Sequence, residues 1–390
     1  MAHKIPHTLS DAAAAKECEN PLPPDGIDAI APIQVTRSAV PDASEYAAYL
    51  AQIFSSGHLT NHGPFVDRLE TALKTRLSVP HLALCANGTL ALQIALRASG
   101  LTGKKVITTP FSYVATVSAL LWEGCTPVFA DIDEETLCLY PHAVSEKITP
   151  DVAGVLPVHI YGNACDVDAF GTMAKDAHLT LIYDGAQCFG SAYKGQSVLN
   201  YGDYATCSFH ATKIFHTVEG GGVVAHSPEA MEALTLLRAF GHHGDVHYRL
   251  GINAKLSELH AAMGLALLDG VESRIAARAK VRDAYDAYLP PLGLRRPALR
   301  NDLKYNHAYY PVIFDDEKTL LCVVERLNAK NIFSRRYFYP ALNTLPYLKE
   351  TQPCPVAESV SRRVLCLPLY PGLEDANIER IADIVKNCLS

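Results

Sequence analysis

Residues 208–222 read SFHATKIFHTVEGGG. The segment begins with residues typical of a strand, and it ends in three consecutive glycines typical of a tight turn. Between them, Lys213 has hydroxyl-bearing and aromatic neighbours. A lysine in a crowded, partly apolar setting is disfavoured as a cation, so its pKa falls and its amine can form a Schiff base. On this spacing alone, an ordinary lysine in a surface loop is the alternative interpretation.

The chain before and after this segment alternates between apolar runs and helical stretches. Apolar runs typical of buried strands occupy residues 82–86, 106–109, 127–130, 154–160, 179–183, 206–209 and 222–225. Patterns typical of helices lie between them at residues 89–98, 112–122, 141–148 and 167–177. Apolar strands that alternate with helical crossovers predict an α/β fold, with a mainly parallel sheet covered by helices on both faces.

The remaining third of the chain has a more mixed pattern. Residues 257–288 are predicted to form one long helix that stops at Pro290-Pro291. Strands are predicted at 309–314 and 363–369, and helices at 318–330 and 373–389. We therefore expect three parts, which are an N-terminal extension (1–31), a large domain (32–290) and a smaller α+β domain (291–390).

Composition excludes several classes of protein. The chain has 390 residues, of which 49% are hydrophobic and 19% are charged, as in compact globular proteins. Its net charge of −7 leaves no basic excess for nucleic acid, and no apolar run approaches the ~20 residues of a membrane helix. The 11 cysteines include no CxxC pair, so we expect core cysteines, a reducing cytoplasm and no metal site.

Two segments upstream of Lys213 carry further chemistry. Residues 181–187 (LIYDGAQ) place Asp184 at the end of an apolar strand, where α/β sheets bind ligands. In pyridoxal phosphate enzymes, such a carboxylate keeps the ring nitrogen protonated. Residues 85–90 (CANGTL) open a helix, whose N-terminus suits a phosphate. Taken alone, each segment has an ordinary alternative. An Asp at a strand end is commonly a helix cap, and residues 85–90 can be a plain strand-to-helix turn.

Taken together and in order, these segments resemble the DegT/DnrJ/EryC1/StrS nucleotide-sugar aminotransferases, which are fold type I pyridoxal phosphate enzymes. The resemblance extends over residues 33–389, and the matching pieces are 57–64 (GHLTNHGP), 87–92 (NGTLAL), 110–116 (PFSYVAT), 157–162 (PVHIYG), 184–187 (DGAQ), 208–222 and 251–258 (GINAKLSE). It implies pyridoxal 5'-phosphate as cofactor, and a homodimer with shared active sites.

The resemblance also assigns roles to individual residues. Lys213 forms the Schiff base with the cofactor and then carries the proton, while Asp184 pairs with the pyridinium nitrogen. Gln187 lies near the 3′ oxygen of the ring, and Tyr113 stacks on its face. The residues that hold the phosphate come from separate segments, and they are Gly88, Thr89, Ser208 and, from the neighbouring subunit, Asn253.

The residue at position 213 implies the reaction. Relatives with histidine there are sugar 3-dehydratases, so Lys213 implies transamination. Residues 210–217 (HATKIFHT) resemble those of enzymes that move the amino group of L-glutamate to C4 of dTDP-4-keto-6-deoxy-D-glucose, giving dTDP-4-amino-4,6-dideoxy-D-glucose. The alternatives are another nucleotide, another epimer or the 3-keto position.

A non-catalytic, cofactor-binding regulator is a less favoured alternative, because Lys213, Asp184 and Gln187 are all present and no DNA-binding appendage is recognisable. A Rossmann-type reductase is disfavoured, because no GxGxxG motif follows the first strand.

Candidate substrate-binding residues are spread along the chain. Arg238 and Lys255 bound a histidine-rich segment that either neutralises the pyrophosphate of a sugar nucleotide or forms a solvated loop. His216 either contacts the sugar or shapes the turn after Lys213. Three further candidates come from the 57–64 motif and from the region expected to close over the substrate, and they are Thr60, Tyr337 and Tyr339.

Overall fold

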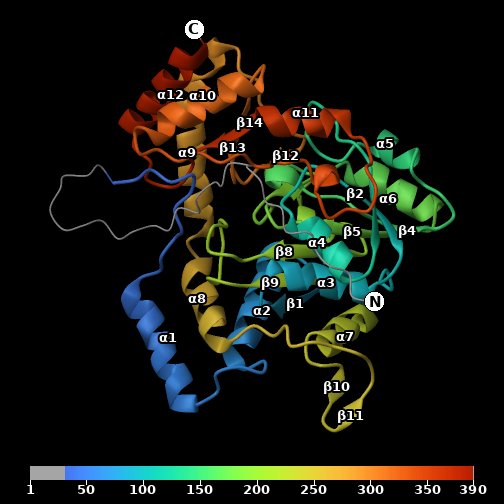
Figure 1. Cartoon of the computed structure of the whole chain (residues 1–390). Coiled ribbons are helices and arrows are strands. Elements are labelled where there is room, and N and C mark those ends of the chain that lie inside the picture. Colours follow the sequence, from blue (N-terminus) through green and yellow to red (C-terminus); the bar gives the residue numbers. More distant parts are fainter. Residues whose placement is uncertain (1–30, 390) are drawn as a thin grey trace, which may run out of the picture. The chain divides into compact units, whose positions relative to one another are not determined.

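The computed structural model describes residues 31–389 (Figure 1). Its centre is a seven-stranded sheet of order β1-β9-β8-β5-β4-β2-β3. The strands are β1 (His81–Cys85), β2 (Lys105–Thr108), β3 (Thr126–Phe129), β4 (Val152–Leu156), β5 (Thr180–Asp184), β8 (Tyr204–Ser208) and β9 (Gly221–Ala225). β8, β5, β4, β2 and β3 are parallel, whereas β9 runs antiparallel to both β1 and β8. The predicted α/β fold with a mainly parallel sheet is confirmed.

Both faces of the sheet are buried. Leu82 and Leu84 of β1 point into one hydrophobic cluster, while Ala83 and Cys85 point into another, because successive side chains of a strand alternate between faces. The helices of the first cluster are α2 (Pro64–Leu77), α6 (Val167–Asp176) and α8 (Glu258–Leu268), and those of the second are α3 (Gly88–Ala98) and α7 (Pro228–Leu237). α4 (Ala115–Trp122) contributes to both clusters.

A further core forms towards the C-terminus. The long helix α9 (Val271–Tyr288) leads from the large sheet to an antiparallel pair, β13 (Tyr310–Ile313) and β14 (Val364–Leu367). The helices beside this pair are α10 (Glu317–Asn328), α11 (Pro355–Arg363) and α12 (Asp375–Leu389). Tyr285 of α9 packs in one hydrophobic cluster with residues of β13, β14 and α12. The domain boundary at 290/291 stays a prediction. The predicted extension, residues 1–31, lies outside the described residues except for Ala31.

The shorter elements complete the chain. They are α1 (Ala43–Ser56), α5 (Pro141–Ser145), β6 (Ala192–Tyr193), β7 (Gln196–Ser197), β10 (His242–His243), β11 (Val246–His247) and β12 (Leu303–Lys304). β10 and β11 form a hairpin that projects away from the sheet (Figure 1). Among the helices of residues 31–389, none is long and apolar enough to cross a membrane.

Two predicted elements differ from the observed ones. The single helix predicted over 257–288 is wrong, because α8 ends at Leu268 and α9 begins at Val271, with Gly270 as its N-cap. The strand predicted over 154–160 ends at Leu156, just before Pro157. Glycine destabilises a helix because its backbone is the most flexible, and proline lacks the N–H that regular structure uses. The spacing of apolar residues reveals neither effect.

A buried carboxylate fixes the start of α2. Glu258, which is fully buried, accepts hydrogen bonds from the backbone N–H groups of Phe65 (2.8 Å) and Val66 (3.1 Å). The free N–H groups at a helix start are favourable partners for a negative charge. Gly63 precedes this helix because a Cβ there would lie 2.7 Å from the Glu258 carboxylate. The loop of residues 57–63 is thereby fixed against α8.

Candidate active site

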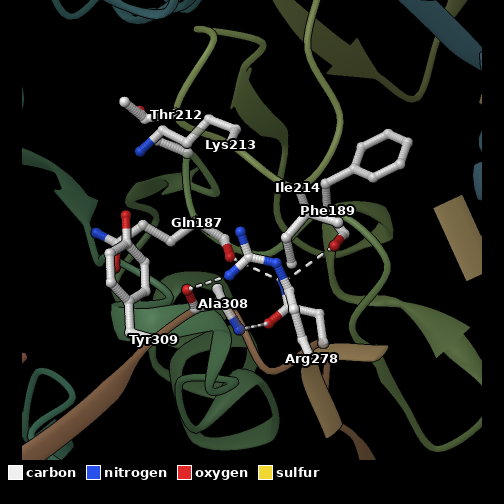
Figure 2. A pocket seen from close by; sticks show the side chains of 10 residues that line it. Gln187, Phe189, Thr212, Lys213, Ile214, Arg278, Ala308 and Tyr309 are labelled. Atoms are coloured by element: carbon white, nitrogen blue, oxygen red, sulfur yellow. Dashed lines mark hydrogen bonds between the residues drawn. The ribbon is translucent and has the colours of Figure 1, made fainter. Parts of the chain in front are cut away.

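The candidate site lies at the carboxyl ends of two neighbouring parallel strands. Asp184 is the last residue of β5 and Ser208 is the last residue of β8, and Lys213 lies in the turn that follows β8. Ligands of α/β sheets bind at such strand ends. Figure 2 shows the small cavity beside Lys213, which Gln187 and Tyr309 also line.

Three of the predicted site residues influence Lys213 electrostatically. Burial lowers the pKa of the Lys213 amine, and the nearby Asp184, Tyr337 and Tyr113 act in the opposite direction. A lysine with a lowered pKa has a larger neutral fraction, and only the neutral amine is a nucleophile and a proton acceptor. Tyr113 is 59% exposed, so one face of the site is open.

The Asp184 carboxylate is buried and held from two sides. Burial raises its pKa, whereas the hydrogen bonds from the Ala186 N–H (3.0 Å) and the Thr116 hydroxyl (2.8 Å), together with the charge of Lys213, lower it. Ser112 lies behind Thr116, with the two hydroxyl oxygens 2.9 Å apart. Sequence reasoning missed Thr116 as a functional residue, although it closes the quoted 110–116 motif.

Around the turn before α3 there is no room for a side chain at two glycines. Asn87 caps α3 by accepting the Leu90 N–H (2.8 Å). A Cβ on Gly88 would lie 2.9 Å from the Ser208 Cβ, and one on Gly221 would lie 2.5 Å from the Asn87 carbonyl oxygen. The glycines therefore bring the helix start next to the Ser208 hydroxyl, and Thr89 adds a second hydroxyl in the first turn. Helix N-termini with such donors bind phosphate groups.

The donor set fits pyridoxal 5'-phosphate. Asp184 would pair with the ring nitrogen, Lys213 would bind the aldehyde carbon, and the turn at Gly88, Thr89 and Ser208 would hold the phosphate. Gln187 lines the cavity of Lys213, and its side-chain oxygen accepts the Tyr161 N–H (2.6 Å).

The cavity wall opposite Lys213 is held by a buried cation. Arg278 donates a hydrogen bond to the Ala308 carbonyl oxygen (3.2 Å) (Figure 2). It also donates to the Leu369 carbonyl oxygen (2.9 Å) and to the Thr36 hydroxyl (3.3 Å). Burial lowers the pKa of Arg278 to about 10. Arg278 thus links α9 to three segments that surround the site.

The structure places several predicted substrate residues away from this cavity. His216 is buried, with Nε2 2.8 Å from the Ala39 carbonyl oxygen, and its Nδ1 accepts the Val218 N–H (3.2 Å) within the turn. Lys255 lies over the Phe240 ring at 5.0 Å, and Arg336 lies over the Tyr339 ring at 3.6 Å. Thr60 and Asn253 are exposed, and neither is among the residues that line the Lys213 cavity in Figure 2.

Arg238 requires a correction. It was expected to contact a pyrophosphate, but it is only 4% exposed and pairs with the buried Glu70 (2.5 Å). It also donates to the Leu84 carbonyl oxygen (2.9 Å) at the end of β1. A guanidinium that is already paired within the chain and shielded from water is not free to bind a ligand.

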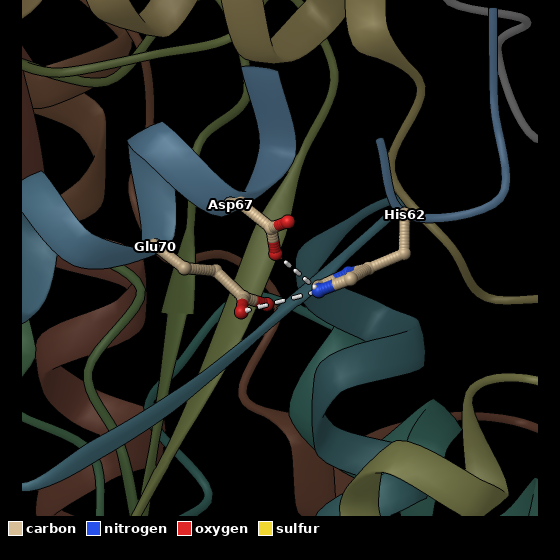
Figure 3. Close-up of side chains that lie close together, drawn as sticks. All are labelled: His62, Asp67 and Glu70. Carbon is tan, nitrogen blue, oxygen red and sulfur yellow. Dashed lines mark ion pairs between the residues drawn. The ribbon is translucent and has the colours of Figure 1, made fainter. Parts of the chain in front are cut away.

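Figure 3 shows Glu70 of this ion pair together with His62 and Asp67. The His62 Nε2 atom lies 2.8 Å from the Asp67 carboxylate and 3.8 Å from that of Glu70. Among the described residues, this group has the spacing of a metal site. However, the Arg238 charge already neutralises Glu70 and repels a cation, so we assign the group to anchoring α2 against β1.

Comparisons with known proteins agree with the sequence resemblance, which is thereby confirmed. The profile of the DegT/DnrJ/EryC1/StrS aminotransferase family matches residues 41–386. The dTDP-4-amino-4,6-dideoxy-D-glucose transaminase of Shigella dysenteriae is 37% identical over 362 residues, which cover 91% of this chain and 98% of the relative.

Two further matches are informative. The GDP-perosamine synthase of Vibrio cholerae is 33% identical over 348 residues, covering 87% of this chain and 95% of the relative. The crystal structure of DesI in the presence of its TDP-sugar product superimposes with a TM-score of 0.86 at 34% identity, covering 92% of this chain and 93% of that chain.

We predict that Arg238→Met destabilises the protein. Removal of one partner leaves Glu70 buried and unpaired, which costs about 3–5 kcal/mol of unfolding free energy. Denaturant unfolding measures the loss. The double variant Glu70→Gln/Arg238→Met is expected to recover much of it, because the amide still accepts the Leu84 N–H. A weaker binding of sugar nucleotide with unchanged stability would instead support the original expectation for Arg238.

Proposed function

Because the chain belongs to the DegT/DnrJ/EryC1/StrS aminotransferase family, we propose that it moves the amino group of L-glutamate to C4 of a nucleotide-linked 4-keto-6-deoxyhexose. The proposed acceptor is dTDP-4-keto-6-deoxy-D-glucose, and the product is dTDP-4-amino-4,6-dideoxy-D-glucose. The observation that carries the proposal is the match to a transaminase of that name along nearly the whole length of both chains. The cofactor is pyridoxal 5'-phosphate.

The side chains of the site would serve this chemistry as follows. When bound, pyridoxal 5'-phosphate supplies a ring that takes up the electron pair left behind as the donor carbon loses its proton. Lys213, with its lowered pKa, is a base that accepts this proton and later returns it. Asp184, fixed by Thr116 and by the Ala186 N–H, would hold the proton on the ring nitrogen.

Tyr337 has the strongest support among the residues proposed to bind the sugar nucleotide. Burial raises the pKa of its phenol, and the charges of Arg335 and Lys213 oppose this effect. Tyr337 also lines a cavity together with Thr212, the residue before Lys213. The Tyr161 hydroxyl donates to the main-chain oxygen of Tyr337 and fixes this segment. Thr60, His216, Lys255 and Tyr339 stay predictions, as do the phosphate contacts of Asn253.

A second copy of the chain is the proposed partner. Large apolar side chains lie exposed along residues 240–252 and nearby, among them Phe240 (52%), Tyr248 (61%), Leu250 (74%) and Trp122 (81%). Trp122, Leu250 and the predicted phosphate residue Thr89 line one cavity of about 530 Å³. Exposed apolar surface of this extent marks an interaction site. We propose a homodimer in which this face is covered and each Asn253 reaches the phosphate of the other subunit.

A GDP-linked 4-keto sugar is the second candidate acceptor, since the Vibrio cholerae relative is a GDP-perosamine synthase. Other nucleotides, epimers and the 3-keto position are further outcomes of the same assay.

The first prediction of the proposed function concerns the cofactor and the substrates. The purified enzyme with pyridoxal 5'-phosphate is expected to absorb near ~410–430 nm, because Lys213 forms a Schiff base with it. L-glutamate removes this band, and the correct keto sugar restores it. Assays with dTDP-, GDP- and UDP-linked 4-keto and 3-keto sugars then identify the acceptor.

Two lysine variants provide the control for this prediction. Lys213→Ala is expected to lose the band and about 10³-fold or more of the turnover, since it removes both the Schiff-base amine and the base. The matched variant Lys255→Ala keeps the band. A band that survives in Lys213→Ala contradicts the assignment, and a wild-type band that glutamate never removes favours the regulator instead.

The second prediction concerns Asp184. Thr116→Val preserves shape but removes a hydrogen bond to the ionised carboxylate, so the pKa of Asp184 rises further. Because only the ionised form pairs with the ring nitrogen, activity is lost as the pH falls through this pKa. The acid limb of kcat/KM is therefore expected to move to higher pH, whereas Thr116→Ser keeps it near that of the wild type. An unmoved acid limb in Thr116→Val shows that the hydroxyl does not hold Asp184.

The third prediction tests the shared site. Lys213→Ala and Asn253→Ala are each expected to be impaired, yet their co-expression restores activity, because one site of each mixed dimer has both native residues. Random pairing gives about a quarter of the wild-type activity. Sedimentation equilibrium of the wild type checks for the dimer. Failure of the mixture to exceed its components contradicts an Asn253 contact across the interface.

A further inference from the structure

A pair of thiols lies on two packed helices remote in sequence from Lys213. Cys322 belongs to α10 and Cys388 to α12, and their Sγ atoms are 3.1 Å apart. This is about 1 Å more than the ~2.05 Å of a disulfide bond. The two residues are 66 positions apart along the chain, so the fold alone brings them together.

The two helices already hold this register through other contacts. Arg326 of α10 donates to the Asn387 carbonyl oxygen (2.8 Å), and Arg380 of α12 donates to the Lys330 carbonyl oxygen (2.8 Å). Figure 1 shows α10 and α12 side by side at the end of the molecule that contains the C-terminal core. A bond between the two sulfurs therefore needs only a small movement of side chains.

Solvent exposure distinguishes this pair from the other thiols of the described chain. Cys322 and Cys388 are partly exposed, whereas the other eight cysteines of the described chain are buried. Cysteine oxidation depends on exposure and on thiolate formation, and buried thiols are inert.

We propose that Cys322 and Cys388 are a modification site that forms a reversible disulfide, with a small-molecule disulfide such as oxidised glutathione as the oxidant. The bond fixes the C-terminal helix α12 to α10. A disulfide that closes a loop of this length restricts the unfolded chain, so the oxidised protein resists unfolding more than the reduced one.

The exchange proceeds in two balanced steps. The thiolate of one cysteine attacks a sulfur of oxidised glutathione and expels a glutathione thiolate. The second cysteine then attacks the mixed disulfide and expels the other glutathione thiolate. Two electrons pass from the cysteine pair to one oxidised glutathione, and the two cysteine protons end on the two reduced glutathiones.

The test uses the folded full-length chain in a Cys18→Ser background, which removes the cysteine outside the described residues. The protein is incubated with oxidised glutathione, free thiols are alkylated, and peptides are mapped by mass spectrometry without reduction. The expected result is a Cys322–Cys388 linked peptide that dithiothreitol abolishes, together with a higher Tm. Recovery of both residues fully alkylated, or of stable glutathione adducts on the native pair, overturns the proposal.

Single variants refine the test. Cys322→Ser and Cys388→Ser are expected to stop at a glutathione adduct, and neither gains Tm on oxidation. Both reduced variants keep wild-type transaminase activity. A Tm increase on oxidation in either variant shows that another thiol is responsible and also overturns the proposal.

Discussion

The site depends on two opposite charges buried together at the ends of β5 and β8. Burial alone would neutralise both, since it raises the pKa of Asp184 and lowers that of Lys213. Each group opposes this effect in the other, and the Thr116 hydroxyl and the Ala186 N–H add hydrogen bonds to the carboxylate. These contacts favour the ionised form of Asp184 against its burial, while the amine of Lys213 keeps a lowered pKa. A base that also binds a carbonyl carbon requires such an amine.

The backbone around this pair is arranged for close approach. A Cβ on Gly88 would clash with Ser208, and one on Gly221 would clash with the Asn87 carbonyl, so α3 begins directly against the last residue of β8 and the first residue of β9. Any side chain at these two glycines would separate the helix start from the strands. The overall charge of the chain is negative, so its anionic ligands must be recognised by local groups of this kind: helix N–H groups and hydroxyls.

The sequence predicts the parts of the fold that depend on local pattern. Apolar runs located the seven strands of the sheet, and the order of short motifs located Lys213 and Asp184. Features that depend on distant partners were not predicted. Arg238 is paired with Glu70, 168 positions away, and nothing near Arg238 in the sequence indicates a buried ion pair. The role of Thr116 was missed for the same reason, because Thr116 belongs to α4 and its partner Asp184 ends β5, 68 positions away.

The C-terminal part of the chain contributes residues to the candidate site. Tyr309 and Tyr337 come from it, and the first lines the Lys213 cavity while the second influences the pKa of Lys213. Tyr161, in the turn after β4, donates its hydroxyl to the main chain at Tyr337, and Arg278 of α9 binds the carbonyl oxygens of Ala308 and Leu369. Because these contacts join the C-terminal segments to the ends of the parallel strands, any displacement of those segments alters the environment of Lys213 itself. The electrostatic balance of the site and the packing of the C-terminal core are therefore coupled.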